Sequence, residues 1–264
     1  MLHHSFLLVD VGNTRTKWAV AERFSSSPVR TLVAKDMRLK PKGEMPTGEL
    51  TSSVVRELKN AHEGHYLVLS SVVPRVVPFF STAFKRGFHV INAESNQLGL
   101  KFDYPNPAEI GADRLVAAVA AHAYGLFPTI IVACGTATAF TVLDANGRLC
   151  GGAIAPGLEA QLMALLGATA QLPETQLRKP RSALAKSTQE AVRAGVMLNY
   201  QGGIQEIIRQ LSATFPSDLS PQIFLTGGNA RHLVEHLEVP FKLRPLLVFE
   251  GLLIIGARLF TPPL

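Results

Sequence analysis

The chain has 264 residues, of which 47% are hydrophobic and 17% charged, and this composition is typical of a folded globular protein. No stretch of eighteen apolar residues occurs, and the start of the chain lacks the basic and long apolar regions of a signal peptide, so we expect a cytoplasmic protein without membrane contact. The net charge of +6 is spread along the chain without a zinc-finger or RNP pattern, so no nucleic-acid partner is expected.

The first half of the chain shows the apolar periodicity of alternating strands and helices, which predicts an α/β fold. The stretch 36–51 is rich in Pro, Gly and Lys and is expected to be an exposed loop. The elements expected in this half are strands at residues 6–11, 17–21, 67–72 and 90–92 and helices at residues 76–85 and 112–124.

The second half continues the same alternation. Asp144-Ala145-Asn146-Gly147 is a strong hairpin signal, and Gly202-Gly203 is expected to interrupt a long helix. The elements expected in this half are strands at residues 129–134, 139–143, 148–154 and 223–226 and helices at residues 188–215 and 248–260.

The two halves share a weak internal similarity. In the first half a strand, the turn Asp10-Val11-Gly12-Asn13-Thr14 and a second strand follow one another. In the second half the same order surrounds Ala133-Cys134-Gly135-Thr136-Ala137-Thr138. This repetition predicts two similar units, residues 1–125 and 126–264, each a sheet with helices, on either side of a central cleft where a ligand binds.

The first turn carries groups suited to a nucleotide phosphate. Gly12 permits close approach of the backbone to an anion, Asp10 can hold Mg²⁺, and Lys17 can offset phosphate charge. An ordinary hairpin turn would look the same, so this segment alone leaves both interpretations open.

Two further glycine turns strengthen the nucleotide interpretation. Gly135-Thr136 is the counterpart in the second half, and Thr226-Gly227-Gly228-Asn229-Ala230 ends a strand and is expected to open a helix. Neither the Walker A pattern nor the Rossmann glycine pattern occurs. Three such turns suggest the ATP cleft of actin and hexokinase, and Cys134 between them is interpreted as a small buried hydrophobe rather than a nucleophile.

The stretch 104–114 is the most distinctive part of the sequence. Two prolines hold an extended approach, and Gly111 lets the chain turn into a helix whose first turn contains Asp113 and Arg114. An Asp in that place can accept a proton from a substrate hydroxyl during phosphoryl transfer. It can equally be an Asp favoured by the helix dipole, with Arg114 in a surface ion pair.

Taken together, these motifs resemble type III pantothenate kinases over nearly the whole chain. The family belongs to the superfamily of acetate kinase, sugar kinases, Hsp70 and actin, so the resemblance implies two ribonuclease H-like units of the actin-like fold. The matching segments, in the family's order, are 10–17, Tyr104 followed by Pro107, 111–114, 135–137, Gly151-Gly152-x-Ile154-x-Pro156-Gly157, Ser187-Thr188-x-x-Ala191, 226–228 and Leu247-x-x-Glu250-Gly251-Leu252.

The resemblance implies a cytoplasmic homodimer that phosphorylates pantothenate with ATP and Mg²⁺, or another divalent cation, in the first step of coenzyme A biosynthesis. By similarity Asp113 is the proton acceptor. Judged without the resemblance, Tyr104 would be a packed aromatic residue and Thr188 a helix N-cap. The implied pantothenate-binding residues are Tyr104, Gly111, Ala112, Asp113, Arg114 and Thr188. The implied ATP-binding residues are Asp10, Val11, Gly12, Asn13, Thr14, Arg15, Thr16, Lys17 and Thr136.

The sequence departs from the family at two places. The family has an Asp that ligates a monovalent cation, K⁺ or NH₄⁺, where this chain has Ala133. We expect the cation site to be empty or its charge to be supplied by a basic residue such as those of 178–186, in preference to a site completed by backbone carbonyls and water. Asn199 stands where the family has a helix glycine. Two alternatives remain: a kinase of the superfamily that acts on a sugar or acid, and an ATP-binding accessory or regulatory protein without kinase activity.

Overall fold

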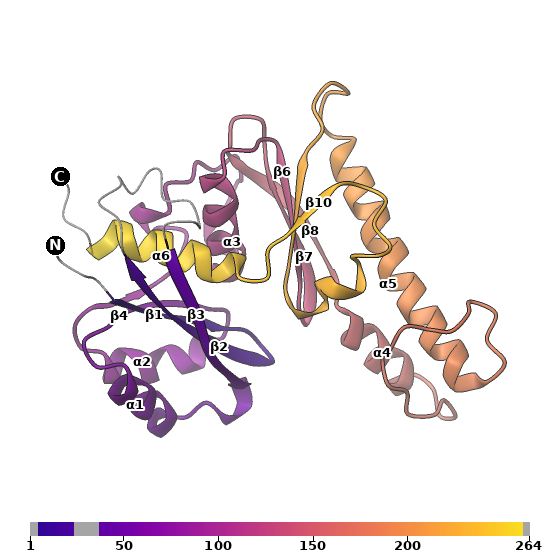
Figure 1. Ribbon diagram of the computed structural model, residues 1–264, viewed down its shortest axis with the longest axis horizontal. Helices are drawn as coiled ribbons and strands as arrows, with labels where there is room; N and C mark the ends of the chain where they lie inside the picture. Colours follow the sequence, from indigo (N-terminus) through magenta and orange to yellow (C-terminus); the bar gives the residue numbers. More distant parts are fainter. Residues whose placement is uncertain (1–4, 24–36, 261–264) are drawn as a thin grey trace. The chain divides into compact units, whose positions relative to one another are not determined.

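The computed structural model describes residues 5–23 and 37–260 (Figure 1). Residue 36 of the expected loop lies outside the described residues. The described residues of Met1–Leu126, Gly147–Leu149 and Leu246–Leu264 form one compact unit, and Phe127–Asn146 with Cys150–Pro245 forms a second.

The first unit contains a five-stranded sheet of strand order β3-β2-β1-β4-β5. Strand β1 pairs antiparallel with β2 and parallel with β4, and β5 continues parallel to β4. Alternate residues of β1 point to opposite faces. Leu7 and Val9 pack with Val55 and Phe80, which belong to two helices on one face. The strands are β1 (Ser5–Val11), β2 (Arg15–Arg23), β3 (Met37–Pro46), β4 (Tyr66–Ser71) and β5 (Phe88–Val90).

The second unit repeats this plan with the order β10-β9-β6-β7-β8. Strand β6 pairs antiparallel with β7 and parallel with β9, and β10 continues parallel to β9. Numbered from its own first strand, each sheet therefore has the same order, so the expected α/β fold with two similar units is confirmed. The strands are β6 (Thr129–Cys134), β7 (Ala137–Leu143), β8 (Leu149–Pro156), β9 (Gln222–Thr226) and β10 (Phe241–Leu243).

Helices cover the sheets within each unit (Figure 1). In the second unit, side chains from two helices complete a core with Ile130, Val132 and Leu225. Within residues 5–23 and 37–260, no helix is both long and apolar enough to cross a membrane. The helices are α1 (Ser52–Ala61), α2 (Val77–Ala83), α3 (Ala112–Ala123) and α6 (Leu247–Phe260) in the first unit, and α4 (Leu158–Gly167) and α5 (Thr188–Ser212) in the second.

The last helix corrects the linear division at residue 125. Helix α6 returns to the first unit and packs against α3, β1 and β4. This packing is close, because a Cβ atom placed on Gly251 would lie 2.0 Å from the carbonyl oxygen of Val116 on α3. The division into 1–125 and 126–264 is therefore wrong for residues 246–260.

The expected loop at 36–51 is also largely wrong, because Met37–Pro46 forms strand β3. This strand lies at the edge of the sheet, where Pro and Lys are tolerated because one row of backbone groups is unpaired. Its register shifts between Trp18 and Ala19 of the neighbouring strand. The indole ring of Trp18 lies where a side chain at Gly43 would be, since a Cβ there would be 2.4 Å from it.

Helix α5 is continuous from Thr188 to Ser212, so the interruption expected at Gly202-Gly203 is wrong. A glycine in a helix costs about 1 kcal/mol relative to alanine. Here the helix is held through both glycines because Tyr200, Ile204 and Ile208 on its inner face are buried in the core. The sequence pattern does not predict α1, α4 or β10.

Candidate functional site

Asp10 lies near the end of β1, between two strands that both contribute polar groups. It is directly opposite Lys17 on β2 and Ser70 on β4. Among the described residues, Asp10 Oδ1 and Ser70 Oγ are buried and have no hydrogen-bond partner. The pKa of Asp10 is raised to about 6, mainly by burial and then by the negative charge of Asp113, while the Ser70 hydroxyl and the Lys17 ammonium act to lower it. A buried carboxylate oxygen without a partner is suited to a cation.

The hydroxyl of Thr47 stabilises the turn after Asp10. It donates to the carbonyl oxygen of Gly12 at 2.7 Å and lies 3.1 Å from the hydroxyl of Thr16, which is buried. The backbone N–H of Gly12 donates to Arg15 at 3.0 Å, which closes the turn. Asn13 and Thr14 remain exposed at its tip, where a ligand could reach them.

Two of the predicted ATP-binding residues in this turn have structural roles. Val11 is a buried strand residue. The guanidinium of Arg15 lies 2.8 Å from the carboxylate of Glu44 on β3. Of the basic side chains in this turn, Lys17 is therefore the one opposite Asp10 and the better placed to offset phosphate charge.

Asp113 lies in the first turn of α3, as predicted, and Gly111 is the N-cap. The backbone N–H of Arg114 donates to Asp113 Oδ1 at 2.8 Å. Burial raises the pKa of Asp113, while this hydrogen bond and the positive charge of Arg114 lower it. A Cβ on Gly111 would lie 2.7 Å from Asp113 Oδ1, so the glycine leaves room for the carboxylate. Ala112 is buried, whereas Tyr104 and Arg114 are half-buried.

In the second unit, three glycine segments meet at the ends of β6 and β9. A Cβ on Gly157 would be 2.3 Å from the carbonyl oxygen of Gly135, and one on Gly227 would be 2.3 Å from that of Cys134. Thr136 is exposed beside them, and its carbonyl oxygen accepts from Gly157 at 3.1 Å. Because the backbones touch directly, no side chain can stand between these turns. Gly227-Gly228 leads into a helix, as expected, which is a short 3-10 helix over Gly228–His232.

Cys134 is fully buried among these turns. Burial raises the pKa of its thiol to about 11. A thiol that stays protonated at neutral pH is a poor nucleophile, so the interpretation of Cys134 as a small buried hydrophobe is supported.

Ala133 occupies the position on β6 that Asp10 occupies on β1, two residues before the turn glycine. Its sheet neighbours are Ala139 and Thr226, where Asp10 has Lys17 and Ser70. These neighbours add no carboxylate, so the position does not fit a cation that needs a charged oxygen. The basic segment suggested as a substitute is partly engaged elsewhere, since Arg178 pairs with Glu190 and Lys179 with Glu235.

A pocket of about 150 Å³ opens at the 3-10 helix that follows Gly227. Helix α5 contributes Met197 and Gln201 to it, and the 3-10 helix contributes Arg231 and His232. Lys179 and Glu235, which form an ion pair, line the pocket with His236. The side-chain amide of Gln201 donates to the carbonyl oxygen of His232 at 2.9 Å. Sequence reasoning named the glycines but missed these side chains, although Arg231 and His232 directly follow the motif.

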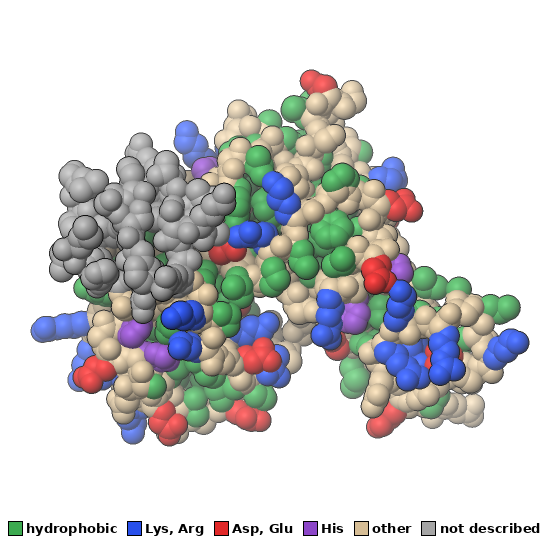
Figure 2. Space-filling model, viewed as in Figure 1, with side chains coloured by type: hydrophobic (Ala, Val, Ile, Leu, Met, Phe, Trp, Pro, Cys, Tyr) green, Lys and Arg blue, Asp and Glu red, His purple; other side chains and the backbone are tan. Residues whose placement is uncertain are grey.

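Thr188 is the first residue of α5 and is exposed. The N-cap is Ser187, whose hydroxyl accepts from the backbone N–H of Glu190 at 3.3 Å. The structure therefore does not support the interpretation of Thr188 as the helix cap. Lys and Arg side chains gather at this end of the second unit (Figure 2), where Arg178, Lys179, Arg181 and Lys186 precede the helix.

The predicted site residues thus fall into two groups. In the first unit the charges of Lys17 and Asp113 both act on Asp10, although Asp113 is far from the other two in the sequence. The second unit holds Thr136 and Thr188.

Comparison with known proteins identifies the family. A family model described as type III pantothenate kinase matches residues 6–210. The type III pantothenate kinase of Paramagnetospirillum magneticum is 35% identical over 264 residues, which is 97% of this chain and 98% of that protein. The enzyme of Rhodospirillum rubrum is 38% identical over 195 residues, 72% of this chain and 75% of its own length.

Solved structures show the fold. A structure described as a Baf family transcriptional activator from Campylobacter jejuni matches with a TM-score of 0.58 and 18% identity, covering 95% of this chain and 96% of that one. The ethanolamine utilization protein EutJ from Carboxydothermus hydrogenoformans matches with a TM-score of 0.50 and 14% identity, covering 97% and 89%. At these identities the likeness concerns the fold alone. The family match spans most of the chain and includes both carboxylates of the first unit, so the chain belongs to the type III pantothenate kinase family.

Proposed function

We propose that this protein transfers the γ-phosphoryl group of ATP to the hydroxyl of pantothenate, the first step of coenzyme A biosynthesis. The observation that carries the proposal is the pair of half-buried carboxylates Asp10 and Asp113, with raised pKa values, in the first unit of a chain of this family. Phosphoryl transfer needs one group to hold the metal and phosphates and another to take the hydroxyl proton.

Asp113 is the proposed proton acceptor. Its carboxylate is oriented by the Arg114 backbone N–H, and burial makes it more basic than an exposed Asp, which favours proton transfer from an alcohol. The proposed pantothenate contacts are Tyr104, Gly111, Ala112, Arg114 and Thr188. Arg114 is suited to the carboxylate of pantothenate.

Asp10 is the proposed ligand of Mg²⁺ or another divalent cation. The fit rests on its buried Oδ1, which has no hydrogen-bond partner among the described residues. When bound, the cation would neutralise phosphate charge. The chain's own contribution would be Lys17 beside the phosphates and the exposed tip of residues 12–14. Thr136 is a further proposed ATP contact.

The pocket at the 3-10 helix that follows Gly227 is the proposed site of the nucleoside. A guanidinium such as that of Arg231 stacks on planar rings, and the apolar side chain of Met197 gives a base a further surface. Lys179 lines the same pocket, where it is paired with Glu235. A monovalent cation has no role in the proposed reaction, because Ala133 does not fit one.

The protein is proposed to be a homodimer that uses the second unit as its interface. Large apolar side chains are exposed there on three elements: Ile154 on β8 and Met163 on α4 at 66% each, and Leu198 on α5 at 47%. The last two elements pack on each other, and Asn199 of α5 hydrogen bonds to Gln161 of α4 at 2.9 Å. Exposed apolar side chains of this size often mark an association surface.

The function is tested by ADP release in a coupled assay, with pantothenate compared against a panel of sugars and small acids. Of these acceptors, we expect only pantothenate to be turned over. Equal or faster turnover of a sugar would assign the chain to another reaction, and ATP binding without turnover of any acceptor would support the accessory role. Asp113→Asn serves as the control for contaminating kinases.

A further inference from the structure

The most deeply buried large polar side chain of the described residues lies outside the proposed catalytic groups. Arg193 on α5 is only 2% exposed and has the largest fully buried side chain among them. Burying a charged group costs several kcal/mol unless its partners are close and complete. The identity of these partners therefore indicates what the arginine does.

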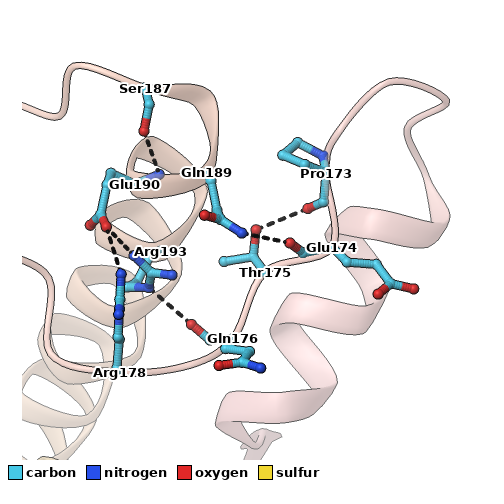
Figure 3. Close-up of polar contacts among 9 residues, drawn as sticks. All are labelled: Pro173, Glu174, Thr175, Gln176, Arg178, Ser187, Gln189, Glu190 and Arg193. Atoms are coloured by element: carbon cyan, nitrogen blue, oxygen red, sulfur yellow. Dashed lines mark hydrogen bonds and ion pairs between the residues drawn. The ribbon is translucent and has the colours of Figure 1, made fainter.

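Arg193 joins the start of α5 to the segment that precedes it (Figure 3). Its guanidinium pairs with Glu190, one turn earlier on the same helix, and its Nε donates to the carbonyl oxygen of Gln176 at 2.9 Å. Arg178 adds a second guanidinium to the same Glu190 oxygen at 3.2 Å. These hydrogen bonds lower the pKa of Glu190, and the Arg193 bond has the largest effect.

Residues 173–178, here called the strap, have no helix or strand of their own. Besides the bonds to Arg193 and Glu190, the strap is held by the side-chain amide of Gln189, which donates to the carbonyl oxygen of Glu174 at 2.9 Å. Thr175 is buried within it. Three residues of the first turns of α5 therefore fix the strap, as Figure 3 shows.

The same helix turns contain Thr188, the proposed pantothenate contact. On one side Ser187 is fixed by its capping bond to Glu190, and on the other Gln189 is fixed by the strap. The Thr188 side chain itself is exposed. Its backbone thus lies between two anchored neighbours, while its hydroxyl stays available for a ligand.

We infer that Arg193, acting through Glu190 and the strap, is a positioning residue that places Thr188 for the substrate. This inference rests on the proposed function, because it assigns Thr188 to the pantothenate site. It predicts an effect on the affinity for pantothenate that is separate from any loss of stability.

The chain offers a matched control on the same helix. Arg209 pairs with Glu206 at 2.7 Å with the same three-residue spacing, but both side chains are exposed. Arg193→Gln and Arg209→Gln are compared for kcat, for KM of each substrate and for thermal unfolding. We expect Arg193→Gln to raise KM for pantothenate about tenfold, the effect of losing a charged hydrogen bond, with KM for ATP unchanged. Arg209→Gln should change neither KM.

Two further variants separate positioning from general structural damage. Arg193→Lys keeps a charge for Glu190 and should restore part of the affinity for pantothenate. Thr188→Ala combined with Arg193→Gln should have nearly the KM of Thr188→Ala alone, because both changes remove the same interaction. If Arg193→Gln does not fold, Glu190→Gln tests the same connection from its other end.

The inference is overturned if Arg193→Gln and Glu190→Gln keep the wild-type KM for pantothenate, if both substrates are affected equally, or if the double variant shows the product of the two single effects. A wild-type protein inactive on pantothenate would instead refute the proposed function. Hydrogen exchange over residues 173–192 then tests the connection itself. Faster exchange in Arg193→Gln than in Arg209→Gln would support it, and equal exchange would exclude it.

Discussion

Asp10 at the end of β1 and Asp113 in the first turn of α3 interact through their charges within the first unit. Burial is the main cause of the raised pKa of each carboxyl, and the charge of Asp113 adds to the effect on Asp10. A divalent cation on Asp10 would remove part of this repulsion and leave Asp113 free to take a proton. The two carboxylates are thus suited to different tasks by their surroundings.

Asp113→Asn is expected to abolish most of the turnover and keep the fold. The amide can still accept the Arg114 N–H but cannot take a proton, and removal of a general base costs about 10²–10⁴-fold in rate. Single-turnover kinetics measure the loss, and circular dichroism checks the fold. A variant that keeps wild-type kcat would remove Asp113 from the mechanism.

Asp10→Asn is expected to weaken the use of Mg²⁺–ATP and to make the protein more stable at neutral pH. Asp10 has a pKa of about 6 in the folded protein against 3.8 for the free group, so the folded form binds more protons between these values. The wild type therefore loses stability as pH rises through about 6, and each pKa unit corresponds to about 1.4 kcal/mol.

Asn does not titrate, so Asp10→Asn should lack this pH dependence. Urea unfolding of both proteins between about pH 4 and pH 8 gives the difference in the free energy of unfolding, which should grow through pH 6 and then level off. If the free energies of unfolding of the two proteins change in parallel with pH, burial does not disfavour the charged form of Asp10. Calorimetry of Asp10→Asn should show impaired nucleotide binding and intact pantothenate binding. The reverse result would mean that the ATP and pantothenate sites are assigned the wrong way round.

Activity is expected to depend little on monovalent cations, because the methyl group of Ala133 cannot coordinate a hard ion. The measurement is turnover in sodium- and potassium-free buffer against a potassium titration, with Ala133→Asp alongside. The variant should gain potassium dependence. Strong potassium activation of the wild type, unchanged in Ala133→Asp, would contradict the expectation.

Arg231→Ala is expected to raise KM for ATP several-fold and leave KM for pantothenate unchanged, since loss of a stacked cation removes about 1 kcal/mol. Arg244→Ala, outside the pocket, is the control. If both variants raise KM for ATP equally, the pocket is excluded as the nucleoside site.

Leu198→Glu is expected to convert the proposed dimer into a monomer, because a carboxylate would have to be buried at the interface. Light scattering at micromolar concentration measures the assembly state. Leu219→Glu, at a position that is also exposed but outside the proposed interface, should remain dimeric. A wild-type protein that is monomeric and active would refute the shared interface.

Local sequence pattern alone was enough to predict much of the fold and of the candidate site. The apolar stretches of β1, β6 and β9 and the glycine turns beside them are marked by adjacent residues, and so is the position of Asp113 after Gly111. Such features depend on neighbours within a few positions, which is the range over which strand alternation, turn chemistry and helix capping act. The repeated Gly-Thr turn likewise indicated two similar units.

Other features depend on contacts between distant segments. Helix α6 joins the first unit because Gly251 fits against Val116, and β3 is a strand because it completes a sheet edge. The burial of Arg193 follows from the strap that covers it. The sequence by itself determined which residues could bind phosphate or accept a proton. Tertiary structure decided which of them are buried or paired, because desolvation and charge coupling arise only when remote segments pack together.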